Sequence, residues 1–176
     1  MIWYSGGINY NYKSNSLYVR LVEKPTGIKA YYSDGTFSDT GTSSAIGVYV
    51  CTSNACFMIP KSDISSNSGK SAWDSQYSTN GVISSVYATD ASSTAKTDYA
   101  GLVNQEYLYN TSSGCEAAKA CYDATVTGYT GTTYRGYLGS CGEWNEAYAN
   151  KSSIDSMMTA IGGTAISTND YYWTST

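Results

Sequence analysis

The chain has 176 residues, of which 41% are hydrophobic and 14% charged, with a formal net charge of −4. This length fits one domain or one domain with a short appendage, and the many aromatic residues exclude a disordered chain. The absence of histidine excludes Ser-His-Asp triads, and the absence of Lys/Arg runs and of long apolar stretches argues against a nucleic-acid partner and a membrane span.

The first part of the chain predicts β-strands. Residues 17–22 are rich in β-forming side chains, and residues 27–32 form a second such run that ends at Asp34-Gly35, a tight-turn signal. The apolar runs 46–50 and 56–59 predict a hairpin with a four-residue loop. We therefore expect several strands joined by short turns before residue 60.

The five cysteines are an odd number, so at least one is unpaired or pairs outside the chain. Cys51 and Cys56 flank the expected hairpin loop, where they form a disulfide or serve as two small apolar residues; both interpretations remain open. Cys115 and Cys121 are six apart on an expected helix, and we predict that they lie on different faces. No CxxC pair exists, which argues against a zinc site.

Residues 61–98 are polar and rich in serine, with Trp73 and Val82-Ile83 as isolated apolar anchors. A linker and a long ordered excursion both fit this composition, and the embedded aromatic residues favour the excursion.

The final third predicts helices. Ser113 to Glu116 and Ser140 to Glu143 both fit a capping box, the first opening the Ala-rich stretch 117–124. A third helix has its apolar residues at i, i+3, i+4 and i+7 and stops at Gly162-Gly163. We expect a strand at 171–173. The apolar residues of the third helix are Ile154, Met157, Met158 and Ile161.

Strands followed by a polar excursion, short helices and a returning strand predict an α+β fold with a mostly antiparallel sheet. Ordered motifs in the chain also resemble the C-type lectin-like domains of gut-bacterial surface proteins and their phages. That group includes variable proteins diversified by retroelements. The matching segments are 32–36, 45–48, 98–104, 137–144, 147–148, 161–165 and 173–176.

The resemblance implies a C-type lectin-like fold with two or three short helices over residues 30–176, preceded by an N-terminal strand or docking segment at 1–29. It places Trp144 and Trp173 in the structural core. The helical spacing of Ile154, Met158 and Ile161 adds these three residues to the expected core. The family usually has Leu-Pro where this chain has Leu138-Gly139. Domains of this family also continue for some tens of residues past the motif at 173–176, so we expect a C-terminally incomplete domain.

The resemblance and the composition together favour a non-enzymatic binding module. The chain has 19 tyrosines and 2 phenylalanines among many small polar residues, a mixture that resembles antibody paratopes; tyrosines on half-buried strands explain it equally well. We expect a virion-surface or extracellular display domain, such as part of a phage tail fibre or an adhesin. Its expected partners are a host-surface receptor, glycan or protein, or neighbouring virion subunits, and we expect a homo-oligomer.

Two alternatives remain. In the first, the chain is an architectural decoration subunit of a virion. In the second, it is an oxidase-like enzyme, because the segment around Glu143-Trp144 also resembles formylglycine-generating enzymes, which share the fold. Those enzymes use cysteines in a later segment, and that segment has no match here.

The residues expected to contact a ligand lie in the loop 167–170 and in the two tyrosines that follow it in the sequence. Asn and Asp in this loop favour a turn over a calcium site, so we predict no metal and no cofactor. The candidate ligand-binding residues are Ser167, Thr168, Asn169, Asp170, Tyr171 and Tyr172.

Overall fold

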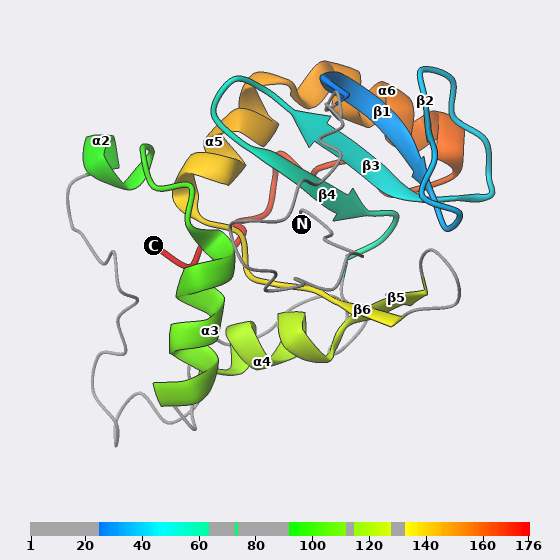
Figure 1. Cartoon of the computed structure of the whole chain (residues 1–176). Helices are drawn as coiled ribbons and strands as arrows, with labels where there is room; N and C mark the ends of the chain where they lie inside the picture. Colours follow the sequence, from blue (N-terminus) through cyan, green and yellow to red (C-terminus); the bar gives the residue numbers. More distant parts are fainter. Residues whose placement is uncertain (1–24, 64–72, 74–91, 112–114, 128–132) are drawn as a thin grey trace, which may run out of the picture.

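The computed structural model describes residues 25–63, 73, 92–111, 115–127 and 133–176. These residues form an α+β fold built on an open, four-stranded antiparallel sheet with strand order β2-β1-β3-β4 (Figure 1). The predicted fold class is therefore confirmed. The strand expected at 17–22 and the apolar anchor Val82-Ile83 lie outside the described residues.

Three of the sheet strands match the sequence predictions. β1 and β3 pair along their whole lengths, and β3 continues through a tight loop into β4, which confirms the predicted hairpin. β1 begins three residues before the domain start expected at residue 30. The strands are β1 (Gly27–Tyr32), β2 (Phe37–Ser38), β3 (Ala45–Cys51) and β4 (Cys56–Pro60).

The turn after β1 has the predicted Asp-Gly chemistry. Gly35 adopts a φ of +84°, a left-handed conformation that side chains other than glycine rarely adopt. The Asp34 carboxylate accepts hydrogen bonds from the backbone N–H and the hydroxyl of Thr36. These local bonds return the chain so that β2 pairs with β1.

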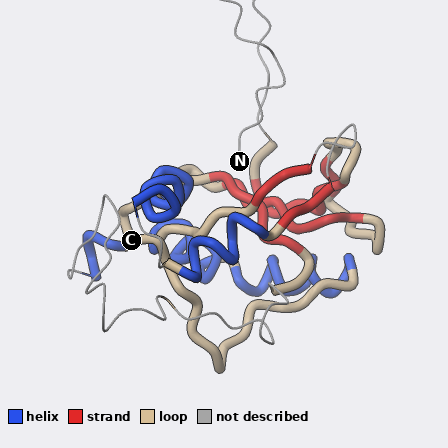
Figure 2. The backbone as a smooth tube through the Cα atoms, turned by 90° about the horizontal axis from the view of Figure 1, so that it is seen from below, coloured by secondary structure: helices blue, strands red, loops and turns tan. Residues whose placement is uncertain are grey.

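Five helices are present among the described residues, where the resemblance implies two or three. The last of them, α6, lies behind the sheet in Figure 1, whereas α3 and α4 lie below it with a small β5–β6 hairpin. Figure 2 shows most of the helices gathered on one side of the strands. The elements are α2 (Ser92–Ala95), α3 (Gly101–Thr111), α4 (Glu116–Asp123), β5 (Thr125–Thr127), β6 (Thr133–Arg135), α5 (Cys141–Ala149) and α6 (Lys151–Ile161).

The main core lies between the sheet and α6. Ile154, Met158 and Ile161 have no exposed surface and belong to the same cluster as Val48 and Val50 of β3. Their spacing along α6 places them on one face, as the sequence predicts. Burying each of these side chains contributes about 1.5–3 kcal/mol.

The ends of α5 and α6 follow their local sequence signals. The Ser140 side chain accepts a hydrogen bond from the Glu143 backbone N–H, and the Glu143 carboxylate accepts one from the Ser140 backbone N–H at 2.8 Å. This is the predicted capping box. α6 ends at Gly162, which has a φ of +72°, so the predicted helix stop is also confirmed.

A second, smaller cluster joins α3 and α4 to the chain before α5. Leu108 of α3 is fully buried, and the Gln105 side chain bridges the Ala118 carbonyl of α4 and the Leu138 backbone N–H. This side chain therefore ties three segments together inside the lower part of the molecule. The cluster consists of Leu108, Cys115, Ala117, Ala118 and Leu138, with Trp73 and Cys121 against it.

The prediction for the start of α4 is wrong. The helix begins at Glu116 with Cys115 as its N-cap and with no side-chain capping bond, so a capping box starting at Ser113 does not open it; Ser113 itself lies outside the described residues. Cys115 and Cys121 are expected on different faces of one helix, but Cys115 is the N-cap residue and precedes the first helical turn. Cys115 belongs to the second cluster, and Cys121 packs against it.

The strand expected at Tyr171–Trp173 is absent, because these residues have no regular secondary structure. The prediction that Trp173 is a core residue is also wrong, since 51% of this side chain is exposed. Its ring lies 5.7 Å from that of Trp73, measured between centroids. Trp144 is half-buried and packs against the main core.

Candidate functional site

The candidate loop, residues 167–172, follows a segment that is firmly attached to the main core. The Thr164 backbone N–H donates to the Lys61 carbonyl at 2.7 Å, just beyond β4. Ile166 is buried, and its backbone N–H donates to the Asp155 carboxylate of α6 at 3.0 Å. The loop therefore starts from a fixed point beside α6.

Ser167 organises the loop from within. Its hydroxyl accepts from the Asn169 backbone N–H at 3.1 Å and donates to the Asp170 carboxylate at 2.8 Å. Its carbonyl also accepts from the Tyr148 hydroxyl of α5 at 3.3 Å. The expected turn at Asn169-Asp170 is present, and the serine hydroxyl closes it.

Tyr172 attaches the far end of the loop to the helices. Its ring stacks on Trp144 of α5 with 4.6 Å between centroids. Its hydroxyl accepts from the Ser167 backbone N–H at 3.0 Å and so closes the loop on itself. Tyr172, which the sequence predicts as a contact residue, is thus half-buried and supports the loop.

The tip of the loop faces solvent. Thr168, Asn169 and Asp170 are exposed, and Tyr171 is 102% exposed relative to an extended reference. Tyr148, which supports the loop from α5, is itself 45% exposed. The result is a small surface with two tyrosine rings and several polar groups on a tied backbone.

The carboxylates of Asp63 and Asp170 give this surface an acidic character. Burial raises the pKa of Asp63, and the nearby Asp170 raises it further. Burial also raises the pKa of Tyr172, an effect that its bond from Ser167 opposes and that Asp63 reinforces. Asp63 therefore lies close to the second half of the loop, near Asp170 and Tyr172.

The chain beyond the loop is held by buried hydrogen bonds. The Ser175 backbone N–H donates to the Gly139 carbonyl, and Ser175 is fully buried. The Thr176 hydroxyl accepts from the Cys141 backbone N–H at 2.9 Å and donates to the Asp98 carboxylate at 2.7 Å. The candidate loop is therefore fixed on both sides.

Asp98 is the centre of this attachment. Its carboxylate accepts from the Ala100 backbone N–H and from the Asn104 amide, each at 2.8 Å. Its backbone carbonyl accepts from the Ser140 hydroxyl and from the Gly142 backbone N–H. Asp98 thereby joins the start of α3, the start of α5 and the last residues of the chain.

Glu143, the glutamate of the Glu-Trp helix, is 7% exposed and fully engaged. Besides its bonds to Ser140, its carboxylate accepts from the Tyr137 hydroxyl at 2.9 Å. Burial raises the pKa of Glu143, although the bonds from Ser140 and Tyr137 partly oppose the rise. Its contacts make it a structural residue of α5.

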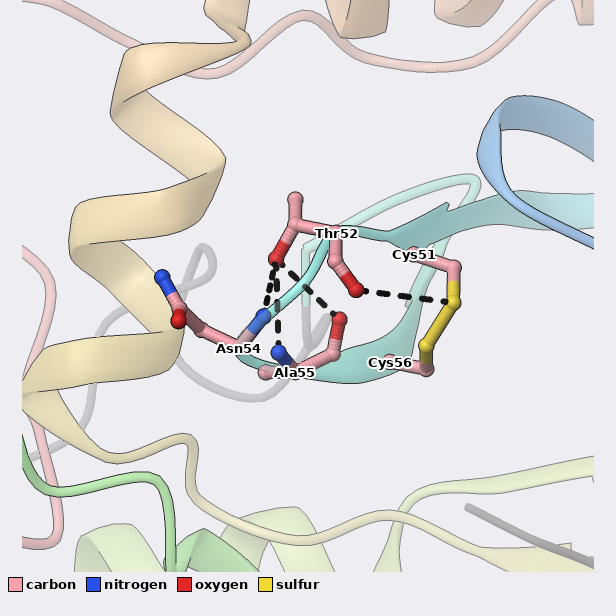
Figure 3. The surroundings of a disulfide bond; sticks show 5 residues. All are labelled: Cys51, Thr52, Asn54, Ala55 and Cys56. Atoms are coloured by element: carbon pink, nitrogen blue, oxygen red, sulfur yellow. Dashed lines mark hydrogen bonds between the residues drawn. A yellow bond between two sulfur atoms is a disulfide. The ribbon is translucent and has the colours of Figure 1, made fainter.

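Cys51 and Cys56 form a disulfide across the first pair of the β3–β4 hairpin, as Figure 3 shows. The Thr52 hydroxyl accepts from the backbone N–H groups of Asn54 and Ala55 inside the loop. Asn54 then donates to Glu146 of α5 at 2.7 Å. The disulfide thus holds a loop that connects the sheet to α5.

The other cysteines have different surroundings. Burial raises the pKa of the Cys121 thiol to about 12, with a further contribution from Cys115, so this thiol stays protonated at neutral pH. Within the described ranges, no three His, Cys, Asp or Glu side chains are grouped closely enough to hold a metal ion. In the same part of the chain, no helix has the length and apolar character required to cross a membrane.

Comparison with protein-family models, with curated proteins and with solved structures finds no match for this chain. The candidate site is therefore defined by the geometry of its residues alone. Sequence reasoning located the loop but missed Tyr148, Asp98 and Asn104, which support it. Asp98 could have been found from the sequence, because aspartate commonly precedes a helix and Asp98 lies just before the first residue of α3.

Proposed function

We propose that this protein is a non-enzymatic display domain whose loop 167–172 binds a receptor. One observation carries the proposal: Tyr171 is completely exposed, while the residues on both sides of it are held by hydrogen bonds and by the Trp144–Tyr172 stack. An exposed aromatic ring on a fixed backbone loses little conformational entropy when it binds a partner.

The chemistry of the loop supports recognition by contact. Tyr171 and Tyr148 offer aromatic rings, and Thr168, Asn169 and Asp170 offer hydrogen-bonding groups of several kinds. Tyrosine supplies a rigid amphipathic contact, and small polar residues adapt around it. A surface of this kind suits the hydroxyls and ring faces of a glycan as well as a protein epitope.

The sequence motifs favour a C-type lectin-like domain from a virion appendage or a surface adhesin. On this proposal the domain works at a virion surface or outside the cell, as part of a homo-oligomer, and its partner is a host-surface receptor. The Cys51–Cys56 disulfide is consistent with an oxidising environment. An architectural subunit that binds only neighbouring virion proteins is the alternative.

The test is binding of the purified chain to arrayed bacterial and host glycans and to intact gut bacteria. We expect Tyr171→Ala to weaken binding at least about tenfold, because a central aromatic anchor contributes about 1.4 kcal/mol or more. The melting temperature should stay within about 1 °C, since Tyr171 is exposed.

Tyr107→Ala is the matched control, because this tyrosine is 42% exposed on α3, away from the loop. It should leave binding unchanged. Equal weakening by both substitutions would remove the loop from the proposal. Binding to no glycan or cell at any concentration would instead favour the architectural alternative.

A further inference from the structure

A cleft of about 540 Å³ lies between α6 and the chain segment that follows β2. Exposed serines of α6 form one side, residues 39–41 form the other, and β1, which passes in front of α6 in Figure 1, contributes to the base. The cleft shares no residue with the loop 167–172. Small-molecule sites in proteins usually enclose about 300–1,000 Å³, so the cleft is large enough to hold a ligand.

The wall formed by residues 39–41 is held in place. The Tyr32 hydroxyl donates to the Thr40 carbonyl at 3.3 Å and accepts from the Thr42 backbone N–H at 3.1 Å. At Gly41 the wall packs so closely on α6 that an added Cβ would lie 2.6 Å from Cγ2 of Ile161. The cleft therefore has a fixed shape before a ligand enters, which lowers the entropy lost on binding.

The base of the cleft is apolar. The side chains of Ile28 and Met157 are half-buried, pack against the main core and line the cleft. Ala160 adds a methyl group to this lining. The base suits the CH groups of a ligand, because their contact with it removes apolar surface from water.

Hydroxyl groups form the α6 side of the rim. Ser152, Ser153 and Ser156 lie on the first two turns of α6 and are exposed. The Ser156 hydroxyl donates to the Ser152 carbonyl at 2.9 Å, so its oxygen still has lone pairs for a ligand donor. A serine hydroxyl both donates and accepts hydrogen bonds. The rim therefore suits a ligand that carries both kinds of group.

The backbone of β1 adds a donor and an acceptor. The Tyr32 N–H donates to the Thr36 carbonyl, and Ala30 pairs with Ser38 of β2. Alternate residues of a strand direct their N–H and C=O groups to the same side, so those of Ile28 also point to the β2 side. β2 ends at Ser38, and no described strand pairs with Ile28 there. This donor and acceptor therefore face the cleft that opens beyond β2.

A carboxylate completes the rim. Asp39 accepts a hydrogen bond from the Lys29 ammonium through Oδ1, and its side chain is 82% exposed. A carboxylate accepts several hydrogen bonds, so Asp39 has capacity for a ligand hydroxyl. Lys29 balances the charge of Asp39, which leaves the described lining of the cleft close to neutral.

We propose that the cleft binds one pyranose ring of a neutral glycan. A pyranose has a CH face, which complements the base formed by Ile28 and Met157. It also has a ring of hydroxyls, which complements the serines, Asp39 and the Ile28 backbone. An extended peptide fits less well, because strand addition uses a row of main-chain hydrogen bonds and β1 offers only those of Ile28. The proposal does not depend on the receptor contact at loop 167–172.

The experiment is a titration of the ¹⁵N-labelled full chain with the methyl pyranosides of glucose, galactose and mannose, followed through the amide resonances. We expect at least one of them to shift the amides of Ile28, Gly41 and Ser153 to saturation. The expected Kd is about 1–10 mM, because a single small ligand on an open surface binds weakly. Sorbitol is the matched ligand: it has the hydroxyls but no ring face, and it should give no saturable shift.

Asp39→Ala should weaken pyranoside binding at least about tenfold, because a hydrogen bond to a charged group is lost. Asp123→Ala is the matched control on α4, since this aspartate is also exposed and its Oδ1 lies 3.9 Å from Nη1 of Arg135. It should leave binding unchanged. Ser156→Phe fills the cleft from an exposed position and should abolish binding.

The absence of saturable shifts at about 100 mM of every pyranoside would overturn the proposal. Equal shifts with sorbitol, or undiminished binding by Asp39→Ala and Ser156→Phe, would overturn it as well. Shifts confined to residues 167–172 would also refute the cleft but leave the receptor loop standing. Tyr171→Ala separates the two sites, because it should weaken receptor binding and leave the cleft shifts unchanged.

Discussion

Tyr172 connects the exposed loop to the core through two separate contacts. Its ring stacks on Trp144, and its hydroxyl accepts a hydrogen bond from the backbone of Ser167. The ring contributes apolar burial, whereas the hydroxyl sets the shape of the loop. These roles are separable, because phenylalanine keeps the ring and removes only the oxygen.

Tyr172→Phe should lower the free energy of unfolding by about 1 kcal/mol, because the Ser167 backbone N–H loses its acceptor. Urea denaturation measures this change. Tyr148→Phe is the matched control: its hydroxyl bond to the Ser167 carbonyl is 3.3 Å long and exposed, and its loss should cost less. An equal cost for both would show that the Tyr172 hydroxyl has no special role.

The two late tryptophans differ in burial, and their contributions to stability should differ as well. Trp144 packs against the main core, so Trp144→Ala should cost about 3 kcal/mol. Trp173 is 51% exposed and its ring contacts that of Trp73 at a tilted angle, so Trp173→Ala should cost about 1 kcal/mol. Thermal unfolding of both variants measures the difference. A larger loss for Trp173 would contradict the structure.

At the scale of elements, the start of α5 is a buried junction with a titratable group in its centre. Burial raises the pKa of Glu143 in the folded state, whereas the unfolded chain has the ordinary value. Between these two values the folded state binds more protons than the unfolded state. The stability that the protonated carboxyl contributes is present below the ordinary pKa and is lost as pH rises through the folded pKa.

Glu143→Gln keeps an oxygen acceptor for Ser140 and cannot ionise. As the pH rises above the ordinary pKa of a glutamate, the free energy of unfolding of this variant should therefore fall less steeply than that of the wild type. Urea denaturation across this range gives both slopes. Burial also raises the pKa of Asp63, but Asp63 is present in both proteins, so its contribution cancels when the two slopes are compared. Identical slopes would show that Glu143 ionises normally in the fold.

The elements that the sequence predicted correctly are those with strong local signals. The β3–β4 hairpin has an apolar run on each side of a short loop, and α6 has a regular apolar stripe with a glycine stop. α3 lacks such a signal, because its buried face is largely polar. Asn104 and Gln105 are buried beside Leu108, while Leu102 and Val103 are 44% and 51% exposed. Apolar periodicity does not identify a helix whose buried face is mostly polar.

The strand expected at Tyr171–Trp173 illustrates the opposite error. Aromatic residues favour strands when they pack on a sheet surface. Here the Tyr172 ring stacks on Trp144 of α5, the Trp173 ring contacts that of Trp73 at a tilted angle, and the Ser175 backbone N–H donates to the Gly139 carbonyl. These tertiary contacts override the local preference. The position of the loop was predictable from its turn residues, but the contacts that support it come from distant segments.

On the scale of the whole molecule, polar contacts link the sheet layer to the lower helices. Asp98 and Ser140 join α3 to α5, and Asn54 joins the disulfide loop to α5. The last residues of the chain attach to the same junction through Thr176. The loop 167–172 lies between this junction and α6, so both of its ends are anchored in the folded core.

The central claim is that loop 167–172 is already ordered before any partner binds. The most direct measurement is the backbone ¹⁵N order parameter of Thr168 to Tyr171 in the free protein. We expect values of about 0.8, close to those of rigid backbone, because hydrogen bonds and the Trp144–Tyr172 stack hold the loop. Values below about 0.6 would describe a flexible loop and would contradict a preformed binding surface.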